Sequence, residues 1–272
     1  MEEKTFTNLP MQRTGRTGPS ILLSIGLLVG LGAWYALVWL GDLPAFILPP
    51  PHVVWERFLR TLADGSLGRH SLVTLTEVLG GLALGVSTAT LLGYTLAKSQ
   101  RLERLLAPFV VASQSVPIVA IAPLLVIWFG PGLLSKVLIS ALIVFFPVLI
   151  NTIVGLRSVP ADLRDLMRSL QASAWQTFRL LEVPAALPIF LGGLRIGATL
   201  SVIGAVVGEF VNADRGLGFL INVGRGQYDT ALVFVAVFAL IGMALALYGL
   251  VALAERRWLS WREGSENQLF SH

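Results

Sequence analysis

The sequence predicts an all-α integral membrane protein with six transmembrane helices and both termini in the cytoplasm. Hydrophobic residues make up 55% of the chain and charged residues 13%, about half the charged share of an ordinary soluble domain. The apolar residues fall into segments of about 20 to 24 residues, each long enough to cross a bilayer as a helix. Lys and Arg gather at the segment ends, mostly on the side that holds both termini, which places that side in the cytoplasm.

Six apolar segments follow one another along the chain. They divide it into a cytoplasmic tail at 1–19, a transmembrane domain at 20–255 and a second cytoplasmic tail at 256–272. After the first segment, prolines break the chain, and Val54, Phe58 and Leu62 then recur at helical spacing. That spacing predicts a short interfacial helix on the outer face. The six segments are roughly 21–40, 78–97, 107–129, 137–156, 188–211 and 232–253.

The third segment is unusually polar and rich in proline. Proline removes a backbone donor, and membrane helices tolerate it where neighbouring groups or water satisfy the freed carbonyls. This segment is therefore a candidate to line a pathway, with a purely structural kink as the alternative. Glu209, near the outer end of the fifth segment, is a candidate to line an outer vestibule. The candidate path residues are Ser113, Gln114, Ser115, Pro117, Glu209 and Asn212.

Other features of the spans favour structural roles. Arg195 lies about two turns from the cytoplasmic end of the fifth segment and can snorkel, and Glu77 lies at the outer edge of the second segment, where we expect it to be interfacial. No pair of intramembrane carboxylates marks a proton relay. Glycines recur at four-residue spacing in several segments, which lets helix backbones approach closely. Packing within one chain is the first interpretation of these pairs, and the tandem pairs at 193–197 and 204–208 are the better candidates for contact with a second copy.

Several function classes are excluded. The chain has no cysteine, so disulfides and thiolate metal sites are excluded, and its three histidines lack ligand spacing. Lys98-Ser99 lacks the upstream glycine of a phosphate loop, so we expect no ATP or other cofactor on this chain. No nucleophile stands with a partnering His and acid, which argues against an enzyme. The net charge of +4 is explained by membrane orientation and not by nucleic acid.

A polar loop of about thirty residues, 157–187, separates the fourth and fifth segments on the cytoplasmic side. A loop of that length in a compact protein is usually functional. It has its own helical pattern and ends near two prolines, Pro184 and Pro188. This pattern predicts a docking element for a cytoplasmic partner, and an interfacial helix that rests on lipid is the alternative.

Within this loop, the chain resembles the permease subunits of binding-protein-dependent ATP-binding-cassette (ABC) importers. Their cytoplasmic signature is Glu-Ala-Ala, three residues, Gly, nine residues, Ile, any residue, and Leu-Pro. Here Asp165-Leu166-Met167 stands in place of Glu-Ala-Ala, Gln171 in place of the Gly, Leu181 in place of the Ile, and Val183-Pro184 in place of Leu-Pro. The spacing is kept while several identities differ. Segments 48–55, 121–130, 145–151 and 193–197 are similar to the nitrate, sulfonate and taurine branch, which also holds permeases for riboflavin and thiamine pyrimidine precursors.

The resemblance implies a type I ABC importer permease fold in the cytoplasmic (inner) membrane, and a non-catalytic subunit. Its partners would be two cytoplasmic ATPases that bind ATP and Mg²⁺, and an extracytoplasmic solute-binding protein. Six helices are too few to enclose a path alone, so we expect a homodimer. The loop would form a coupling helix that docks on the ATPase. The coupling residues implied are Asp165, Arg168, Gln171, Ala172, Ser173, Ala174, Trp175, Phe178 and Pro184.

For the substrate, segments 201–210 and 212–218 are more similar to the vitamin and pyrimidine-precursor permeases than to the sulfonate permeases. Riboflavin or a related heterocycle is the leading prediction, and a sulfonate, taurine or nitrate is the alternative. An ion-driven secondary transporter would need inverted repeats and intramembrane ion ligands. Neither is visible in the sequence.

Overall fold

The computed structural model describes residues 19–259, which are entirely helical apart from short connections. The tails predicted at 1–19 and 256–272 lie almost wholly outside these residues. The helices are α1 (Pro19–Leu40), α2 (Pro51–Ala63), α3 (Ser66–Lys98), α4 (Gln100–Gln114), α5 (Ile118–Phe129), α6 (Leu133–Arg157), α7 (Ala161–Ser169), α8 (Ala174–Thr177), the π-helical turn η1 (Phe178–Glu182), α9 (Val183–Val211), α10 (Leu217–Gly226) and α11 (Thr230–Trp258).

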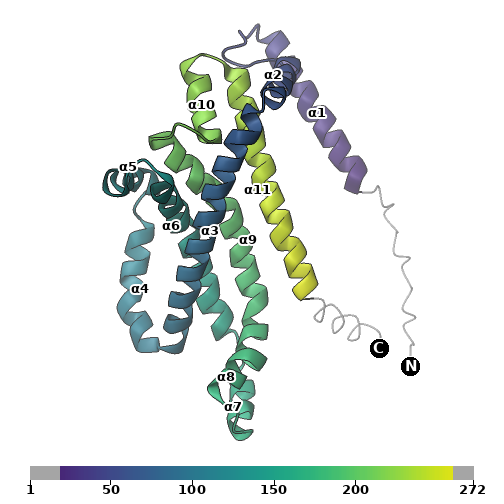
Figure 1. Cartoon of the computed structure of the whole chain (residues 1–272). Helices are drawn as coiled ribbons and strands as arrows, with labels where there is room; N and C mark the ends of the chain where they lie inside the picture. The colour runs from purple at the N-terminus through teal and green to yellow at the C-terminus, as the bar shows by residue number, and fades with distance from the viewer. Residues whose placement is uncertain (1–18, 260–272) are drawn as a thin grey trace, which may run out of the picture.

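The centre of the fold is α6, which lies between α3 and α9 along most of its length (Figure 1). Glycines allow this close approach, because lipid gives no hydrophobic drive for helix association and packing must supply it. Gly81 of α3 and Gly204 of α9 both face Ser140 of α6. Ser140 is fully buried and its hydroxyl donates to the Ser201 carbonyl at 3.0 Å.

The glycine pairs of α9 therefore pack within one chain. A Cβ added at Gly193 would meet Asn151, one at Gly197 would meet Val144 and Val148, and one at Gly208 would meet Lys136. All of these contacts belong to α6. The expectation that these pairs form a surface for a second copy is therefore wrong, because α6 already occupies the grooves they open.

The third apolar segment is not one straight span. It forms α4 and α5, which are bent by 94° at a short break. Pro117 begins α5 with extended backbone, at φ −63° and ψ 119°, and its missing N–H cannot continue the helical ladder. Pro108 and Pro123 are accommodated inside α4 and α5.

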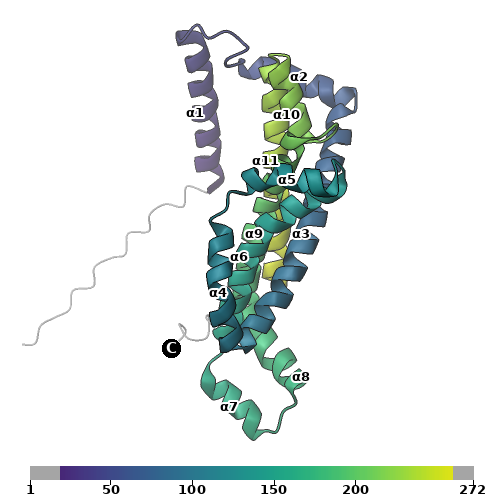
Figure 2. The same cartoon turned by 90° about the vertical axis from the view of Figure 1, so that its left-hand side faces the viewer.

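Within residues 19–259, four helices are long and apolar enough to cross a membrane, namely α3, α6, α8–α9 together and α11, and the bent pair gives up to a fifth. The remaining apolar helix is α1, whose apolar part, Ser24–Leu40, is shorter than these four helices. Most of it stands apart from the body in both views (Figures 1 and 2). Its contacts with the rest include Trp34, which stacks on Phe234 of α11 at 5.1 Å between ring centroids, and Tyr35, which stacks on His52 of α2. The count of six spans stays a prediction.

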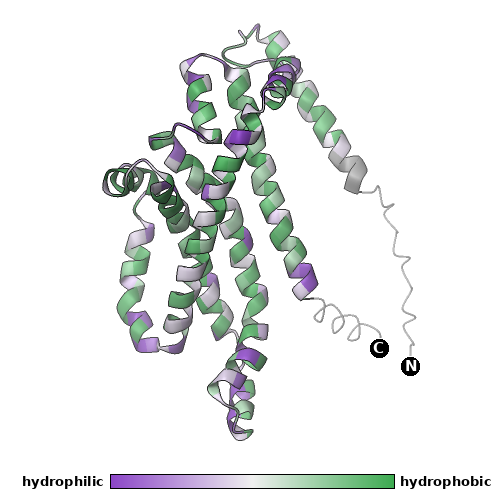
Figure 3. Cartoon of the chain, in the orientation of Figure 1, coloured by the Kyte–Doolittle hydropathy of each residue, from purple (hydrophilic) through white to green (hydrophobic). Residues whose placement is uncertain are grey.

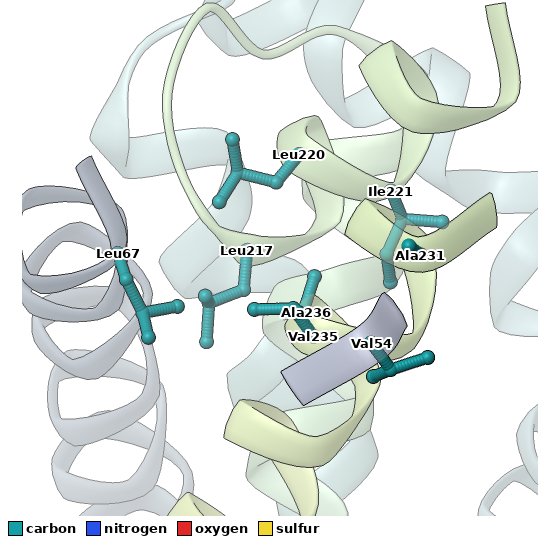
Figure 4. Packing of buried hydrophobic residues seen from close by; sticks show 8 residues of the cluster. All are labelled: Val54, Leu67, Leu217, Leu220, Ile221, Ala231, Val235 and Ala236. Carbon is teal, nitrogen blue, oxygen red and sulfur yellow. The ribbon is translucent and has the colours of Figure 1, made fainter. Parts of the chain in front are cut away.

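One end of the molecule holds a separate apolar cluster formed by α2, α3, α10 and α11. Val54 of α2, Leu67 of α3, and Leu217 and Ile221 of α10 are buried there against the start of α11 (Figure 4). This cluster confirms a short amphipathic helix at 51–63. Asp64 ends that helix and accepts a hydrogen bond from the Ser66 N–H at 2.7 Å, and hydrogen bonds from Ser66 hold the pKa of Asp64 below its ordinary value.

Candidate coupling site

The loop between α6 and α9 projects from the opposite end of the molecule as α7 and α8 (Figures 1 and 2). The colouring by hydropathy shows polar residues gathered on α7, while the bodies of α6 and α9 are mostly apolar (Figure 3). None of the residues of α7 or α8 is buried within the chain. The loop thus presents two short helices to the compartment beyond the spans.

The turn between α7 and α8 is a defined structure centred on Gln171. The Gln171 N–H donates to the Arg168 carbonyl at 2.9 Å, and the Ala172 N–H donates to the Met167 carbonyl at 3.0 Å. These two bonds are those of a Schellman motif, in which the residue after the helix has left-handed backbone and is usually glycine. Gln171 has φ +54°, so it adopts the backbone that glycine would adopt at lower energy.

Substitution at Gln171 tests this turn. Replacing Gln171 by valine is expected to open it, because a β-branched residue is an outlier at positive φ, and the amide of Ala172 should exchange with solvent about tenfold faster. Replacing Gln171 by glycine should instead preserve the motif and slow the exchange. Hydrogen exchange followed by mass spectrometry on peptides that cover the turn measures both changes. Equal exchange in the two variants would contradict the role assigned to the left-handed backbone.

A capping box begins α8. The Ser173 hydroxyl accepts from the Gln176 N–H at 3.2 Å, while the Ser173 N–H donates to the Gln176 side chain at 2.7 Å. This reciprocal pair satisfies two helix N-terminal donors and fixes the direction of the next turn. Trp175 is consequently held outward with 66% of its surface exposed. An exposed tryptophan on a rigid turn is typical of an anchor for a protein partner.

The other predicted coupling residues lie on the same projecting end. Asp165 and Arg168 form an exposed ion pair on α7 at 3.0 Å, which contributes little to stability because water screens it. Ala172 and Ala174 flank the capping serine. Pro184 lies in the first turn of α9 and not on α7 or α8.

Contacts from this loop to α3 were not predicted from the sequence. The Phe178 ring meets the Tyr94 ring edge-on at 5.4 Å and the Trp175 ring at 5.5 Å. The Lys98 ammonium lies 2.5 Å from a carboxylate oxygen of Glu182. In the sequence, Lys98 follows the second apolar segment and Glu182 precedes the fifth, on the same predicted side of the membrane. This shared position is the signal that could have suggested the pair.

A cavity of about 860 Å³ lies between α3, α6, α8 and the start of α9. Four aromatic rings line it, together with the hydroxyls of Ser87, Thr90 and Thr152. The Thr90 hydroxyl is buried without a hydrogen-bond partner among the described residues. None of the described residues that line the cavity carries a charge. The cavity therefore suits an uncharged ligand with aromatic surface and a few polar groups.

A buried cluster of charges joins α3, α6 and α9 at the ends that lie away from the α7–α8 loop. Glu77 of α3 and Lys136 of α6 pair at 3.0 Å, with side chains only 1% and 6% exposed. Glu209 of α9 has no exposed surface, and it accepts hydrogen bonds from the Thr74 hydroxyl at 2.6 Å and from the Gly218 N–H. The Glu77 carboxylate lies beside it. Glu77 is therefore buried and not interfacial as expected, because Lys136 compensates its charge.

The same cluster anchors the N-terminus of α10. Its first amides need partners outside the helix, and the Gly216 N–H donates to His70 at 2.9 Å while the Leu217 N–H donates to Thr74 at 2.8 Å. Gly216 has φ +117°, and a Cβ there would collide with the Glu209 carboxylate. The expectation that Glu209 faces an outer vestibule is thus not met in this structure, where it holds α3, α9 and α10 together. The sequence did not indicate that Glu77 and Glu209 lie in one cluster, where Lys136, Thr74 and the Gly218 N–H contact them.

The remaining path candidates fall into two places. Ser113, Gln114, Ser115 and Pro117 are exposed at the break between α4 and α5, and Ser113 lines a second cavity of about 640 Å³. Asn212 is exposed at the C-terminal cap of α9. Arg195, expected to snorkel, donates to Glu255 of α11 and to the Tyr248 hydroxyl at 3.2 Å.

Known proteins are similar to this chain over most of its length. The family of binding-protein-dependent transport system inner membrane components matches residues 81–260. The riboflavin transport system permease protein RibX of Chloroflexus aurantiacus is 49% identical over 89% of this chain and 91% of its own length. The formylaminopyrimidine transport permease protein ThiX of Halalkalibacterium halodurans is 36% identical over 80% of this chain and 87% of its own.

A solved structure agrees on the fold. A chain of the MetNI methionine ABC transporter, in inward facing conformations, aligns with a TM-score of 0.58 over 74% of this chain and 97% of its own, at 18% identity. The predicted resemblance is confirmed. The chain belongs to the inner membrane components of binding-protein-dependent transport systems, as the non-catalytic, multi-pass permease subunit of an ABC importer.

Proposed function

We propose that this permease carries riboflavin, or a closely related vitamin or pyrimidine precursor, into the cytoplasm. The observation that carries the proposal is the 49% identity to RibX over nearly the whole of both chains. The relative named for a formylaminopyrimidine, another planar heterocycle, is also similar over most of this chain.

The chemistry of the inner cavity supports a neutral heterocycle over an anion. A sulfonate, taurine or nitrate would need a basic partner in a desolvated site, and the described lining residues are aliphatic, aromatic or hydroxyl-bearing, with no basic side chain among them. Arg195, the basic residue within α9, is already engaged by Glu255 and Tyr248. An anionic substrate would therefore find no free cation at these positions.

The permease would act as a homodimer, with an ATPase on the α7–α8 end of each copy and the solute-binding protein at the end formed by α2 and α10. ATP and Mg²⁺ would bind to the ATPase and not to this chain. The segment from Ala172 to Ala174, with Trp175, would be the docking surface, which Asp165, Arg168 and Gln171 shape. Phe178 and Pro184 would connect it to α9. Ser113, Gln114, Ser115, Pro117 and Asn212 remain candidates for the path. Glu209 would not line the path but would support it by holding α3, α9 and α10 together.

The substrate is tested with the complete transporter in proteoliposomes, with its binding protein outside. Uptake of radiolabelled riboflavin is expected to require ATP and to be competed by unlabelled riboflavin, but not by taurine in hundredfold excess. ATP-dependent uptake of taurine without uptake of riboflavin would overturn the substrate and leave the importer intact. Uptake that an ion gradient drives after ATP depletion would overturn the mechanism.

Trp175→Asp tests the docking surface. Loss of a hot-spot tryptophan typically removes 2 kcal/mol or more of binding free energy, so we expect the ATPase to bind at least about 30-fold more weakly. Co-purification of the ATPase with tagged permease measures the change. Trp55→Asp is the matched control, because Trp55 is similarly exposed but lies on α2 at the other end of the molecule. Equal ATPase recovery with both variants would show that α8 merely rests on lipid.

A further inference from the structure

The docking segment is continuous with α9 through a π-helical turn. Residues 174–211 form one long helical stretch, in which the Val183 N–H bonds to the Phe178 carbonyl, five residues back. Pro184 follows, and its missing N–H frees the carbonyl of Leu180, which loosens the ladder at this point. Such single π turns within helices are frequent at functional sites. The docking segment therefore meets α9 at a local irregularity of the helix, and other contacts must fix its position.

Those contacts come from the cytoplasmic end of α3. Glu182, the last residue of the π turn, is 4% exposed and pairs with Lys98, the last residue of α3. Its second carboxylate oxygen is buried without a hydrogen-bond partner among the described residues. A buried carboxylate with one partner depends on that partner, because removal of one member of such a pair leaves an uncompensated charge.

Aromatic rings extend the link outward to the docking surface. Lys98 lies over the Tyr94 ring at 5.5 Å, Tyr94 meets Phe178 edge-on, and Phe178 lies against the exposed Trp175. Aromatic pairs in such geometry contribute beyond their buried area. A displacement of Trp175 thus reaches α3 through packed groups, without passing through α9.

Helices α3 and α9 are in contact near their outer ends, and the cavity lies between them nearer the cytoplasm. Val78 of α3 packs on Ala198 and Val202 of α9, whereas Ser87 of α3 and Leu187 of α9 line the cavity nearer the cytoplasm. The Lys98–Glu182 and Tyr94–Phe178 contacts therefore join α3 to the segment before α9 at the cytoplasmic side of this cavity, while α3 and α9 touch at its outer side. Movement of the docking segment would change the separation of α3 and α9 across the cavity only while the Lys98–Glu182 and Tyr94–Phe178 contacts are intact.

We propose that the Lys98–Glu182 ion pair and the Tyr94–Phe178 contact form a transmission joint, which converts movement of the docked ATPase into movement of α3. The inference rests on the proposed docking of the ATPase at Trp175. Lys98 and Glu182 are then positioning residues: they touch neither substrate nor ATP, and their loss uncouples hydrolysis from transport.

The joint is tested in proteoliposomes with the complete transporter, by riboflavin taken up per ATP hydrolysed. Lys98→Met and Glu182→Gln are expected to retain the ATPase and its hydrolysis, and to lower this ratio at least about fivefold, the low end of measured coupling between sites. The exchanged pair, Lys98→Glu with Glu182→Lys, should restore it to within about twofold. Glu255→Gln, which breaks the ion pair between α9 and α11, is the matched control and should leave the ratio unchanged.

Each alternative outcome overturns the joint. An unchanged ratio in both single variants shows that the pair is only structural, and failure of the exchanged pair to restore the ratio shows that charge pairing is not what transmits the movement. If the single variants do not fold, Tyr94→Leu keeps apolar volume and should still lower the ratio; an unchanged ratio there also refutes the joint.

A second readout does not depend on the substrate. Because the chain has no cysteine, spin labels can be placed at Ser87→Cys and Leu187→Cys across the cavity. ATP trapping should change their separation in the parent protein but not in the Lys98→Met variant. Failure of the proposed function is distinguishable: the parent transporter would then take up no riboflavin, or Trp175→Asp would not release the ATPase. A Lys98→Met protein that shows the parental distance change overturns the joint alone.

Discussion

Replacing Lys136 by methionine is expected to remove most of the folded protein from the membrane. The change leaves Glu77 and Glu209 buried beside each other without a cation. Breaking a buried ion pair in this way costs about 3–5 kcal/mol, a large part of the roughly 5–15 kcal/mol that stabilises a typical domain. Size-exclusion chromatography of detergent-solubilised protein, with a melting curve, should show a lower monodisperse yield and a Tm lower by roughly 10 °C.

Two companion variants separate charge pairing from side-chain size. Lys136→Met combined with Glu77→Gln removes both members of the pair, and it should recover most of the lost yield, because Glu209 keeps its bonds from Thr74 and Gly218. Glu56→Gln breaks an exposed pair with Arg60 and should change stability by no more than about 0.5 kcal/mol. Wild-type yield and Tm in the Lys136→Met variant would show that the two carboxylates do not depend on the lysine.

Replacing Gly204 by alanine is the second change with a large expected effect. The added Cβ would lie 2.5 Å from the Cα of Ser140, 3.1 Å from its Cβ and 3.3 Å from its backbone nitrogen. These atoms belong to the backbone of α6 or are attached to it, so no side-chain rotation relieves the collision and the helices must separate. Overpacking of this kind costs about 1–3 kcal/mol, and we expect a loss at the upper end, measured as a fall in Tm.

A control on the same helix isolates the contact. Gly192 of α9 has nothing within 4 Å of an added Cβ, so Gly192→Ala should be neutral or stabilising by up to about 1 kcal/mol, through the higher helix propensity of alanine. The two substitutions are chemically identical and differ only in what they face. Equal Tm values for the two variants would contradict the close approach of α6 and α9 at Ser140.

The coupling loop shows how far local sequence rules reach. Its length and its helical pattern follow from residues close together in the chain. The family signature has glycine at the position of Gln171, and the structure has left-handed backbone there. Lys98 is 84 residues from its partner Glu182, and no local rule joins two residues at that separation.

By itself, the sequence determined the helical membrane class, the positions of the apolar segments, the amphipathic helix α2 and the family. These properties depend on hydrophobic periodicity, length and charge at segment ends, all of which act within one segment. Only the tertiary structure decided which face of each helix is buried against a neighbour. Glycines proposed to meet a second copy meet α6 instead, and Glu77, Lys136 and Glu209 come together from three helices. The physical reason is that lipid and protein interior are equally apolar, so hydropathy cannot distinguish a lipid-facing side chain from a packed one.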